Sequence, residues 1–130
     1  MVDAQRLNDL LAAYGVPWDP ARADYDKTTI AASNAVESPF ITDGTLFAAF
    51  APDSWLDVMD VTDYEGANVI WKMCEPVPQN LHETYDVIFN GSVLDNIFDP
   101  AQAIRNMTRL LAPHGRIIHI ERIAPVKAPN

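Results

Sequence analysis

Cysteine, basic residues and long apolar runs are all scarce in this sequence. Its single cysteine, Cys74, excludes an intrachain disulfide, and no charged and then apolar N-terminal segment resembles a secretory signal, so we expect a cytoplasmic protein. No apolar stretch approaches the roughly 20 residues that span a bilayer. Nine Lys and Arg stand against eighteen Asp and Glu, and the resulting charge of -9 argues against nucleic acid and membranes as partners.

Residue types that bind metal ions or form nucleophiles are also poorly placed. The histidines His82, His114 and His119 lie far apart, and none has metal-ligand spacing with Cys74. A lone cysteine without an organised histidine partner is usually inert packing. No order of Ser, His and Asp along the chain indicates a catalytic triad. We therefore expect no metal site, and the catalytic residues stay unknown.

What the sequence does contain is enough apolar material for one folded domain. Its 130 residues are 48% hydrophobic and 21% charged, which is typical of globular proteins. This length supports one hydrophobic core. We expect a single domain over residues 1–130, with an N-terminal helix and arm over 1–26 and a loose tail over 124–130.

Three helices are predicted from capping residues and apolar spacing. Each begins at a side chain that can cap a first turn: Asp3, then Thr42 or Asp43, then Asp99 followed by Pro100. Apolar residues recur at helical spacing behind each cap. The expected buried stripes are Leu7, Leu10, Leu11 and Tyr14, then Leu46, Phe47 and Phe50, then Ile104, Met107 and Leu111. The expected ends are Gly15, Pro52 and the run Pro113, His114, Gly115.

Five short apolar segments are predicted to be strands. They span residues 28–32, 55–61, 69–73, 85–90 and 116–123. Helices or long connections separate them, which favours parallel strands joined by right-handed crossovers. We expect a three-layer α/β fold with a mainly parallel sheet in the order 3-2-1-4-5.

Several residues, most of them polar, lie at the ends of the predicted strands, at the edge where an open parallel sheet presents its ligand groups. They are Ser33 and Asn34, Asp60, Lys72 and Met73, and Asn90 and Gly91. Asp60 matters most, because a carboxylate there can accept hydrogen bonds from a ribose diol, worth roughly 1.5 to 3 kcal/mol. The alternative is that Asp60 and Asp63 only cap the turn in DVTDYEG.

Several motifs between residues 57 and 121 carry a family resemblance. They are the acidic strand end at Asp60, the turn DYEGA, the strand and loop YDVIFNGSVLDNIFDP and the helix exit RLLAPHGRI. Together they resemble the central part of class I S-adenosylmethionine-dependent methyltransferases, a family with a Rossmann-like fold. The resemblance implies that Asp60 holds the cofactor ribose and that Asn90 and Gly91 line its methionine side. It also implies substrate contacts in the SVLDNIF loop, where Asp95 and Asn96 are otherwise a turn that leads into a helix.

The predicted cofactor-binding residues are therefore Ser33, Asp60, Met73, Asn90 and Gly91. The predicted cofactor is S-adenosylmethionine, and the methyl acceptor, a small molecule or a protein, stays unknown.

Three features depart from the family pattern. The chain has no G-x-G loop for close backbone approach to the cofactor, and the corresponding position reads IAASNAVES. Lys72 stands where relatives often carry an acid that receives the adenine amino group, so a donor would face a donor. The usual Pro-Gly-Gly is Pro113, His114, Gly115. Two functions stay open: a methyltransferase, or a degenerate methyltransferase fold that serves as a protein-interaction or structural module.

The predicted sheet also stops early. Only seven residues follow Ile123, whereas a complete fold of this family adds two further strands, so we expect a sheet truncated after the fifth strand. The strand over 116–123 would then be an open edge, which invites pairing with another chain. We expect a homodimer through this edge.

Overall fold

The computed structural model describes residues 2–24, 40–63 and 66–121. The chain divides into two compact units, Met1–Val58 and Met59–Asn130. The single domain expected from chain length stays a prediction. The strand expected over 28–32, with Ser33 and Asn34 behind it, lies outside the described residues, as does the tail over 124–130.

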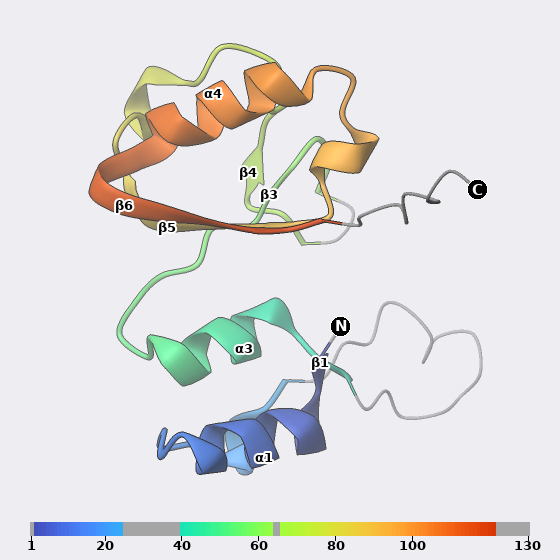
Figure 1. Ribbon diagram of the computed structural model, residues 1–130, viewed down its shortest axis with the longest axis vertical. Helices are drawn as coiled ribbons and strands as arrows, with labels where there is room; N and C mark the ends of the chain where they lie inside the picture. The colour runs from blue at the N-terminus through green and yellow to red at the C-terminus, as the bar shows by residue number, and fades with distance from the viewer. Residues whose placement is uncertain (1, 25–39, 64–65, 122–130) are drawn as a thin grey trace, which may run out of the picture. The chain divides into compact units, whose positions relative to one another are not determined.

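Among its described residues, the first unit contains a short antiparallel strand pair and two helices (Figure 1). Strand β1 (Val2–Asp3) pairs with β2 (Phe40–Ile41), and helix α1 (Ala4–Ala13) follows β1 directly. A 3-10 turn, η1 (Pro20–Arg22), and helix α3 (Asp43–Phe50) complete the described elements of this unit.

Helix α1 begins at Asp3, as its sequence predicts. The Asp3 carboxylate accepts hydrogen bonds from the backbone amides of Gln5 at 2.9 Å and Arg6 at 3.1 Å. Leu7 and Leu11 are buried against Ile41 and Ala49, which form the core of this unit. Leu10 and Tyr14, expected on the same stripe, are instead exposed. Ala4 packs against the same core, so the face of α1 that is covered runs through Ala4, Leu7 and Leu11 rather than through Leu10 and Tyr14.

Thr42, not Asp43, is the cap of α3. Its hydroxyl accepts a hydrogen bond from the Thr45 amide at 3.2 Å. The buried side chains of this helix are Thr45 and Ala49, whereas Phe50, expected on the inner face, is 57% exposed. Thr45 is buried because its hydroxyl also accepts a hydrogen bond from the Asp24 amide at 2.8 Å. Of the expected inner face, Leu46 packs against the core and Phe47 is half-buried, so the hydroxyl of Thr45 adds a polar contact to this apolar face.

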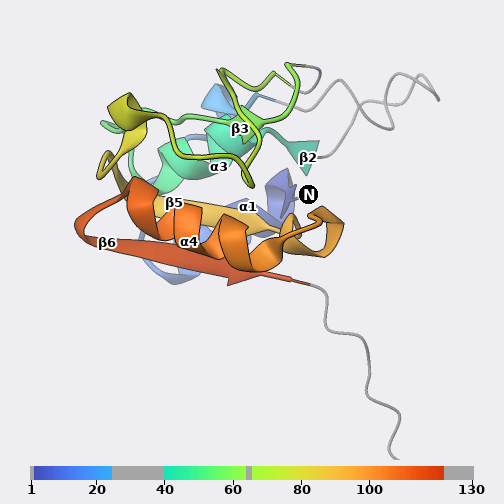
Figure 2. The ribbon, with the colours of Figure 1, turned by 90° about the horizontal axis from the view of Figure 1, so that it is seen from above.

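The second unit contains two parallel strand pairs and one long helix. Strand β3 (Met59–Asp60) pairs with β4 (Val69–Ile70), and β5 (Tyr85–Gly91) pairs with β6 (Leu111–Ile120). Helix α4 (Pro100–Leu110) lies alongside the β5–β6 pair in both views (Figures 1 and 2). Two 3-10 turns, η2 (Gln79–Leu81) and η3 (Leu94–Asn96), connect these elements.

The parallel pairs are those expected from the predicted strand order. Strands β3 and β4 correspond to the second and third predicted strands, which are neighbours in the predicted order. Strands β5 and β6 correspond to the fourth and fifth predicted strands, which are also neighbours in it. The strand expected between them falls in the undescribed segment 25–39. A combination of helices and parallel strand pairs is typical of the Rossmann-like α/β class, which is the class that the sequence indicates.

Strands β3 and β4 are shorter than their sequences predict. Each contributes two residues to the ladder, in place of the expected ranges 55–61 and 69–73. After Asp60 the chain turns, and after Trp71 a second turn is closed by a hydrogen bond from the Glu75 amide to the Lys72 carbonyl at 2.8 Å. Met73 therefore lies in a turn beyond β4 rather than in the strand.

The junction between α4 and β6 also differs from prediction. The helix ends at Leu110, and Leu111 is already extended and pairs with Tyr85. The register shifts before the next pair, Val87 with Arg116, so the residues between form an irregular bend. Gly115 is required there, because a Cβ atom at this position would lie 2.9 Å from the Ala112 carbonyl oxygen.

The core of the second unit forms between α4, the strand pairs and the connecting turns. Trp71, Val77 and Leu110 are its buried centre, with Met59, Met73, Leu81, Tyr85 and Ile88 packed around them. Helix α4 buries Ala103, Asn106, Met107 and Leu110, which share one i, i+3, i+4, i+7 face. The expected stripe was right for Met107 and wrong for Ile104, which is 44% exposed. The predicted buried face was displaced by one residue along the helix, because a polar residue, Asn106, occupies the face that is actually buried.

Candidate functional site

A cluster of polar side chains, with buried Asn90 at its centre, lies at the carboxyl ends of β5 and β6. Asn90 is only 3% exposed and stands opposite His119 in the strand register. The Asn90 Nδ2 atom lies 3.1 Å from His119 Nδ1 and also donates a hydrogen bond to Glu121 Oε1. We call Asn90, His119 and Glu121 the polar cluster. It occupies the strand edge where the sequence predicts ligand groups.

Glu121 also holds the loop that leaves β5. Its Oε1 atom accepts a hydrogen bond from the Leu94 backbone amide at 3.3 Å. The Ser92 amide donates to the Ile120 carbonyl at 2.7 Å, which joins the start of the same loop to the end of β6. Asp95 and Asn96 follow in the turn η3, where the Asn96 amide group donates to the Ser92 carbonyl at 3.3 Å. The chain is therefore tied down on both sides of the polar cluster.

Two acceptor atoms of the cluster have no hydrogen-bond partner among the described residues. They are Asn90 Oδ1 and Glu121 Oε2, and both atoms are buried. A buried acceptor without a donor costs about 1 to 3 kcal/mol, so such atoms indicate a missing donor. S-adenosylmethionine carries an ammonium group and two ribose hydroxyls, all of them donors. The cluster therefore fits the cofactor that the sequence predicts at Asn90 and Gly91.

Asp60 lies at the end of β3 with its side chain exposed. Its Oδ1 atom accepts hydrogen bonds from the amides of Val61 and, at 3.4 Å, Thr62. Its backbone carbonyl accepts from the Trp71 amide at 2.9 Å, beside the β3–β4 pair. The turn-capping alternative for Asp60 is thus present in the structure. Its contact with a ribose stays a prediction.

Met73 is held in place by a residue that the sequence analysis missed. Asn106 is 0% exposed, and its Nδ2 atom donates to the backbone carbonyls of Met73 and Glu75, both at 2.7 Å. Its Oδ1 atom accepts from Gln102 Nε2 at 2.9 Å, so both ends of the amide are used. The sequence feature that could have indicated this role is the side-chain amide at position 106, because it lies on the same helical face as Ala103, Met107 and Leu110.

Lys72 is paired with Glu75 on the surface. The ammonium and the carboxylate oxygen lie 3.4 Å apart, and both side chains are more than half exposed. Exposed pairs of this kind contribute about 0 to 1 kcal/mol, so this one holds the lysine only weakly. The nearby Cys74 is exposed, and its Sγ atom lies 3.6 Å from the Asp99 carbonyl oxygen.

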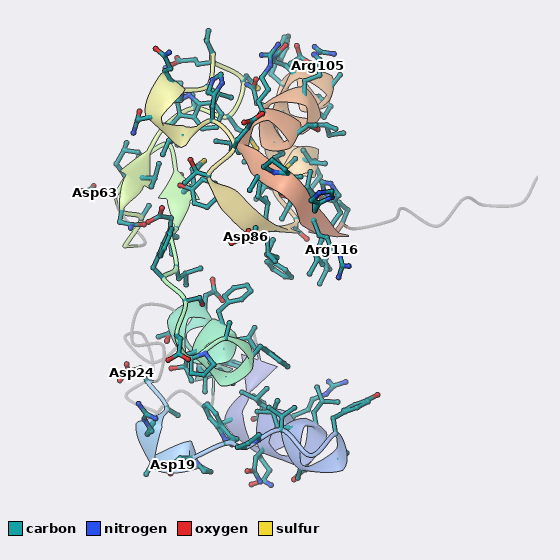
Figure 3. All side chains as sticks on the ribbon, turned by 90° about the vertical axis from the view of Figure 1, so that its left-hand side faces the viewer. Asp19, Asp24, Asp63, Asp86, Arg105 and Arg116 are labelled. Carbon is teal, nitrogen blue, oxygen red and sulfur yellow. The ribbon has the colours of Figure 1, made fainter. Side chains whose placement is uncertain are left out.

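The predicted cofactor residues are distributed over distinct parts of the second unit. Asn90 and Gly91 belong to the β5–β6 pair, Asp60 to the β3–β4 pair, and Met73 to the turn bound by Asn106. Figure 3 labels Asp63 on the β3 side and Asp86 and Arg116 on the β5–β6 pair. Ser33 lies outside the described residues.

Among the residues that the structure describes, no three His, Cys, Asp or Glu side chains lie together as possible metal ligands. No described helix combines the length and the apolar character needed to cross a membrane.

Comparison with known proteins identifies the segment around the polar cluster. Residues 65–119 match the model of a family described as a methyltransferase domain. This segment, less than half of the chain, is similar to that family, which confirms the resemblance to class I S-adenosylmethionine-dependent methyltransferases found in the sequence. It includes Met73, Asn90 and Gly91, whereas Asp60 and Glu121 fall just outside it. No curated protein and no solved structure matches the chain.

Proposed function

We propose that this protein binds S-adenosylmethionine and transfers its methyl group to an acceptor that is still unknown. The observation that carries the proposal is the buried Oδ1 atom of Asn90, which has no donor among the described residues and lies at a strand end inside the segment that matches the methyltransferase model. A family match and an unsatisfied acceptor at the family's ligand edge are independent of each other. The family match supports the cofactor, and the acceptor supports a ligand with a donor group, which S-adenosylmethionine has.

The residues that would hold the cofactor are those predicted from the sequence. Asn90 and Gly91 would contact the methionine side, Asp60 the ribose, and Met73 and Ser33 the remaining surface. The bound cofactor supplies a methyl group on a sulfonium, which is reactive toward nucleophiles. The protein's part is to bind and orient, because displacement of this kind depends chiefly on positioning. We assign no catalytic residue.

A second candidate is a degenerate methyltransferase fold that acts as an interaction or structural module. The exposed Lys72–Glu75 pair and the use of Asp60 Oδ1 within its own turn support it. A lost adenine acceptor and a lost glycine loop would each weaken binding, and about 1.4 kcal/mol is tenfold in affinity.

Further proposals concern the surroundings of the protein. A homodimer through the strand edge over 116–123 is proposed because β6 carries the half-exposed Ile118 and Ile120. We also propose a cytoplasmic location and neither nucleic acid nor membrane as partner, from the single cysteine and the charge of -9.

Calorimetric titration with S-adenosylmethionine and S-adenosylhomocysteine separates the two functions. The wild-type chain, Asp60→Ala and the matched control Asp63→Ala, an exposed carboxylate in the same turn, would be compared. Binding that Asp60→Ala abolishes and Asp63→Ala leaves intact supports the enzyme and contradicts the degenerate module. Absence of heat up to millimolar ligand contradicts the enzyme.

A further inference from the structure

We infer that Glu121 is a positioning residue that sets which end of the Asn90 amide faces the ligand. The inference rests on the proposed function and adds to it a residue outside the matched segment. Glu121 follows β6, and its Oε1 atom accepts hydrogen bonds from Asn90 Nδ2 and from the Leu94 amide. These contacts join positions that are 31 and 27 residues apart in the chain.

The chemistry of the three side chains makes the carboxylate decisive. A side-chain amide offers a donor at one end and an acceptor at the other, and a 180° flip exchanges them. His119 Nδ1 lies 3.1 Å from the Asn90 amide nitrogen, but an imidazole nitrogen accepts in one tautomer and donates in the other. His119 therefore tolerates either orientation. An ionised carboxylate only accepts, so Glu121 requires the NH2 end of Asn90 to face it.

The consequence is a fixed acceptor at the site. With Nδ2 bound to Glu121, the Oδ1 atom of Asn90 points elsewhere, and it is buried without a partner among the described residues. Glu121 Oε2 is a second buried acceptor that likewise has no partner among the described residues. Two unsatisfied acceptors select a donor, such as a ligand ammonium or hydroxyl, and reject a ligand carboxylate. Without Glu121, Asn90 could present its NH2 group instead and reverse this preference.

The Leu94 contact extends the effect to the loop. Ser92 and Leu94 are anchored to the end of β6 by the Ile120 carbonyl and by Glu121. Losing the carboxylate would release the Leu94 amide while the Ser92 backbone contact remains. The loop carrying Asp95 and Asn96 would then move more freely beside Asn90.

The test compares Glu121→Ala, Glu121→Gln and His119→Ala with the wild type, and Asp86→Asn serves as an exposed control on β5. The first readout needs no ligand: 15N NMR follows the Asn90 side-chain NH2 signals and the hydrogen exchange of the Leu94 amide. We expect Glu121→Ala to change the chemical shifts of the Asn90 NH2 signals and to raise the hydrogen-exchange rate of the Leu94 amide at least tenfold. Glu121→Gln, which keeps one acceptor oxygen, should show a smaller change. His119→Ala should leave Leu94 exchange unchanged.

The second readout is the affinity for S-adenosylhomocysteine by calorimetry. We expect Glu121→Ala to weaken it about tenfold or more, Glu121→Gln less, and Asp86→Asn not at all. Unchanged Asn90 signals and Leu94 exchange in Glu121→Ala would overturn the inference, as would unchanged affinity despite altered signals. If Glu121→Ala fails to fold, the same criteria apply to Glu121→Gln. Shifted Asn90 signals and faster Leu94 exchange in Glu121→Ala, in a chain that binds neither ligand, would uphold the role of Glu121 in fixing Asn90 and overturn only the methyltransferase function.

Discussion

The side-chain amide of Asn106 donates hydrogen bonds to the backbone carbonyls of both Met73 and Glu75, each at 2.7 Å. This one buried residue of α4 thereby closes the turn after β4, which contains a predicted cofactor residue. The amide is fully used, because Gln102 donates to its oxygen. Burying an amide is favourable only when its hydrogen bonds are made, as they are here.

Replacing Asn106 with alanine should therefore strongly destabilise the second unit. Both carbonyls would lose a buried donor and a cavity would form, so we expect a loss of about 2 to 4 kcal/mol in the free energy of unfolding. Urea denaturation followed by Trp fluorescence measures it. Asn96→Ala is the control, because Asn96 is exposed, and it should change stability by less than about 0.5 kcal/mol. Equal effects of the two substitutions would contradict the role of Asn106.

Gly115→Ala should destabilise the protein, whereas Gly44→Ala should not. An added Cβ at Gly115 would lie 2.9 Å from the Ala112 carbonyl oxygen and 3.0 Å from the Tyr85 carbonyl oxygen, so the backbone must move. We expect a loss of about 1 to 3 kcal/mol. At Gly44, within α3, the nearest atom is Thr42 Oγ1 at 3.9 Å, and alanine should stabilise the helix by about 0.5 to 1 kcal/mol. Thermal unfolding monitored by circular dichroism would show opposite shifts in Tm, and shifts of the same sign would refute this account.

Lys72→Asp should increase cofactor affinity if the protein binds S-adenosylmethionine. An acid would accept from the adenine amino group where Lys72 now presents a donor. The site is exposed, so we expect a gain of threefold to tenfold, about 0.7 to 1.4 kcal/mol. Calorimetry with S-adenosylhomocysteine measures it. Arg105→Asp, an equal charge change on exposed α4, should leave affinity unchanged. If both variants gain equally, overall charge and not the adenine contact is responsible.

Ile120→Lys should convert the proposed homodimer into a monomer. Ile120 is half-exposed on β6, and a lysine on an edge strand opposes pairing with another chain. Light scattering at high concentration would report the mass of each form. Ile104→Lys, a comparable exposed position on α4, should leave the mass unchanged. A monomeric wild-type chain would rule out the edge-strand dimer.

Much of the local structure was predictable because it depends on neighbours in the chain. The caps at Asp3 and Asp99 accept hydrogen bonds from amides two or three residues ahead. Such contacts form wherever the right side chain precedes a helix. The two parallel strand pairs were also anticipated, because apolar segments separated by long connections pair in parallel.

Part of the candidate site was predictable for the same reason. Asn90 and Gly91 end a predicted apolar strand, and the structure places them at the carboxyl end of β5, with Asn90 buried and Gly91 exposed. Which partners they would meet was not predictable. From the sequence, His119 was considered only as a metal ligand, and Glu121 was not among the expected site residues.

The sequence by itself determined the α/β class, the helix caps and the methyltransferase resemblance, since each depends on residue type and short-range spacing. Only the tertiary structure decided which face of each helix is buried, as Ile104 and Asn106 show. It also decided that Glu121 meets Asn90 across 31 residues. Burial and long-range hydrogen bonds depend on which residues pack against a side chain, and the spacing of residues in the sequence does not show which residues these are.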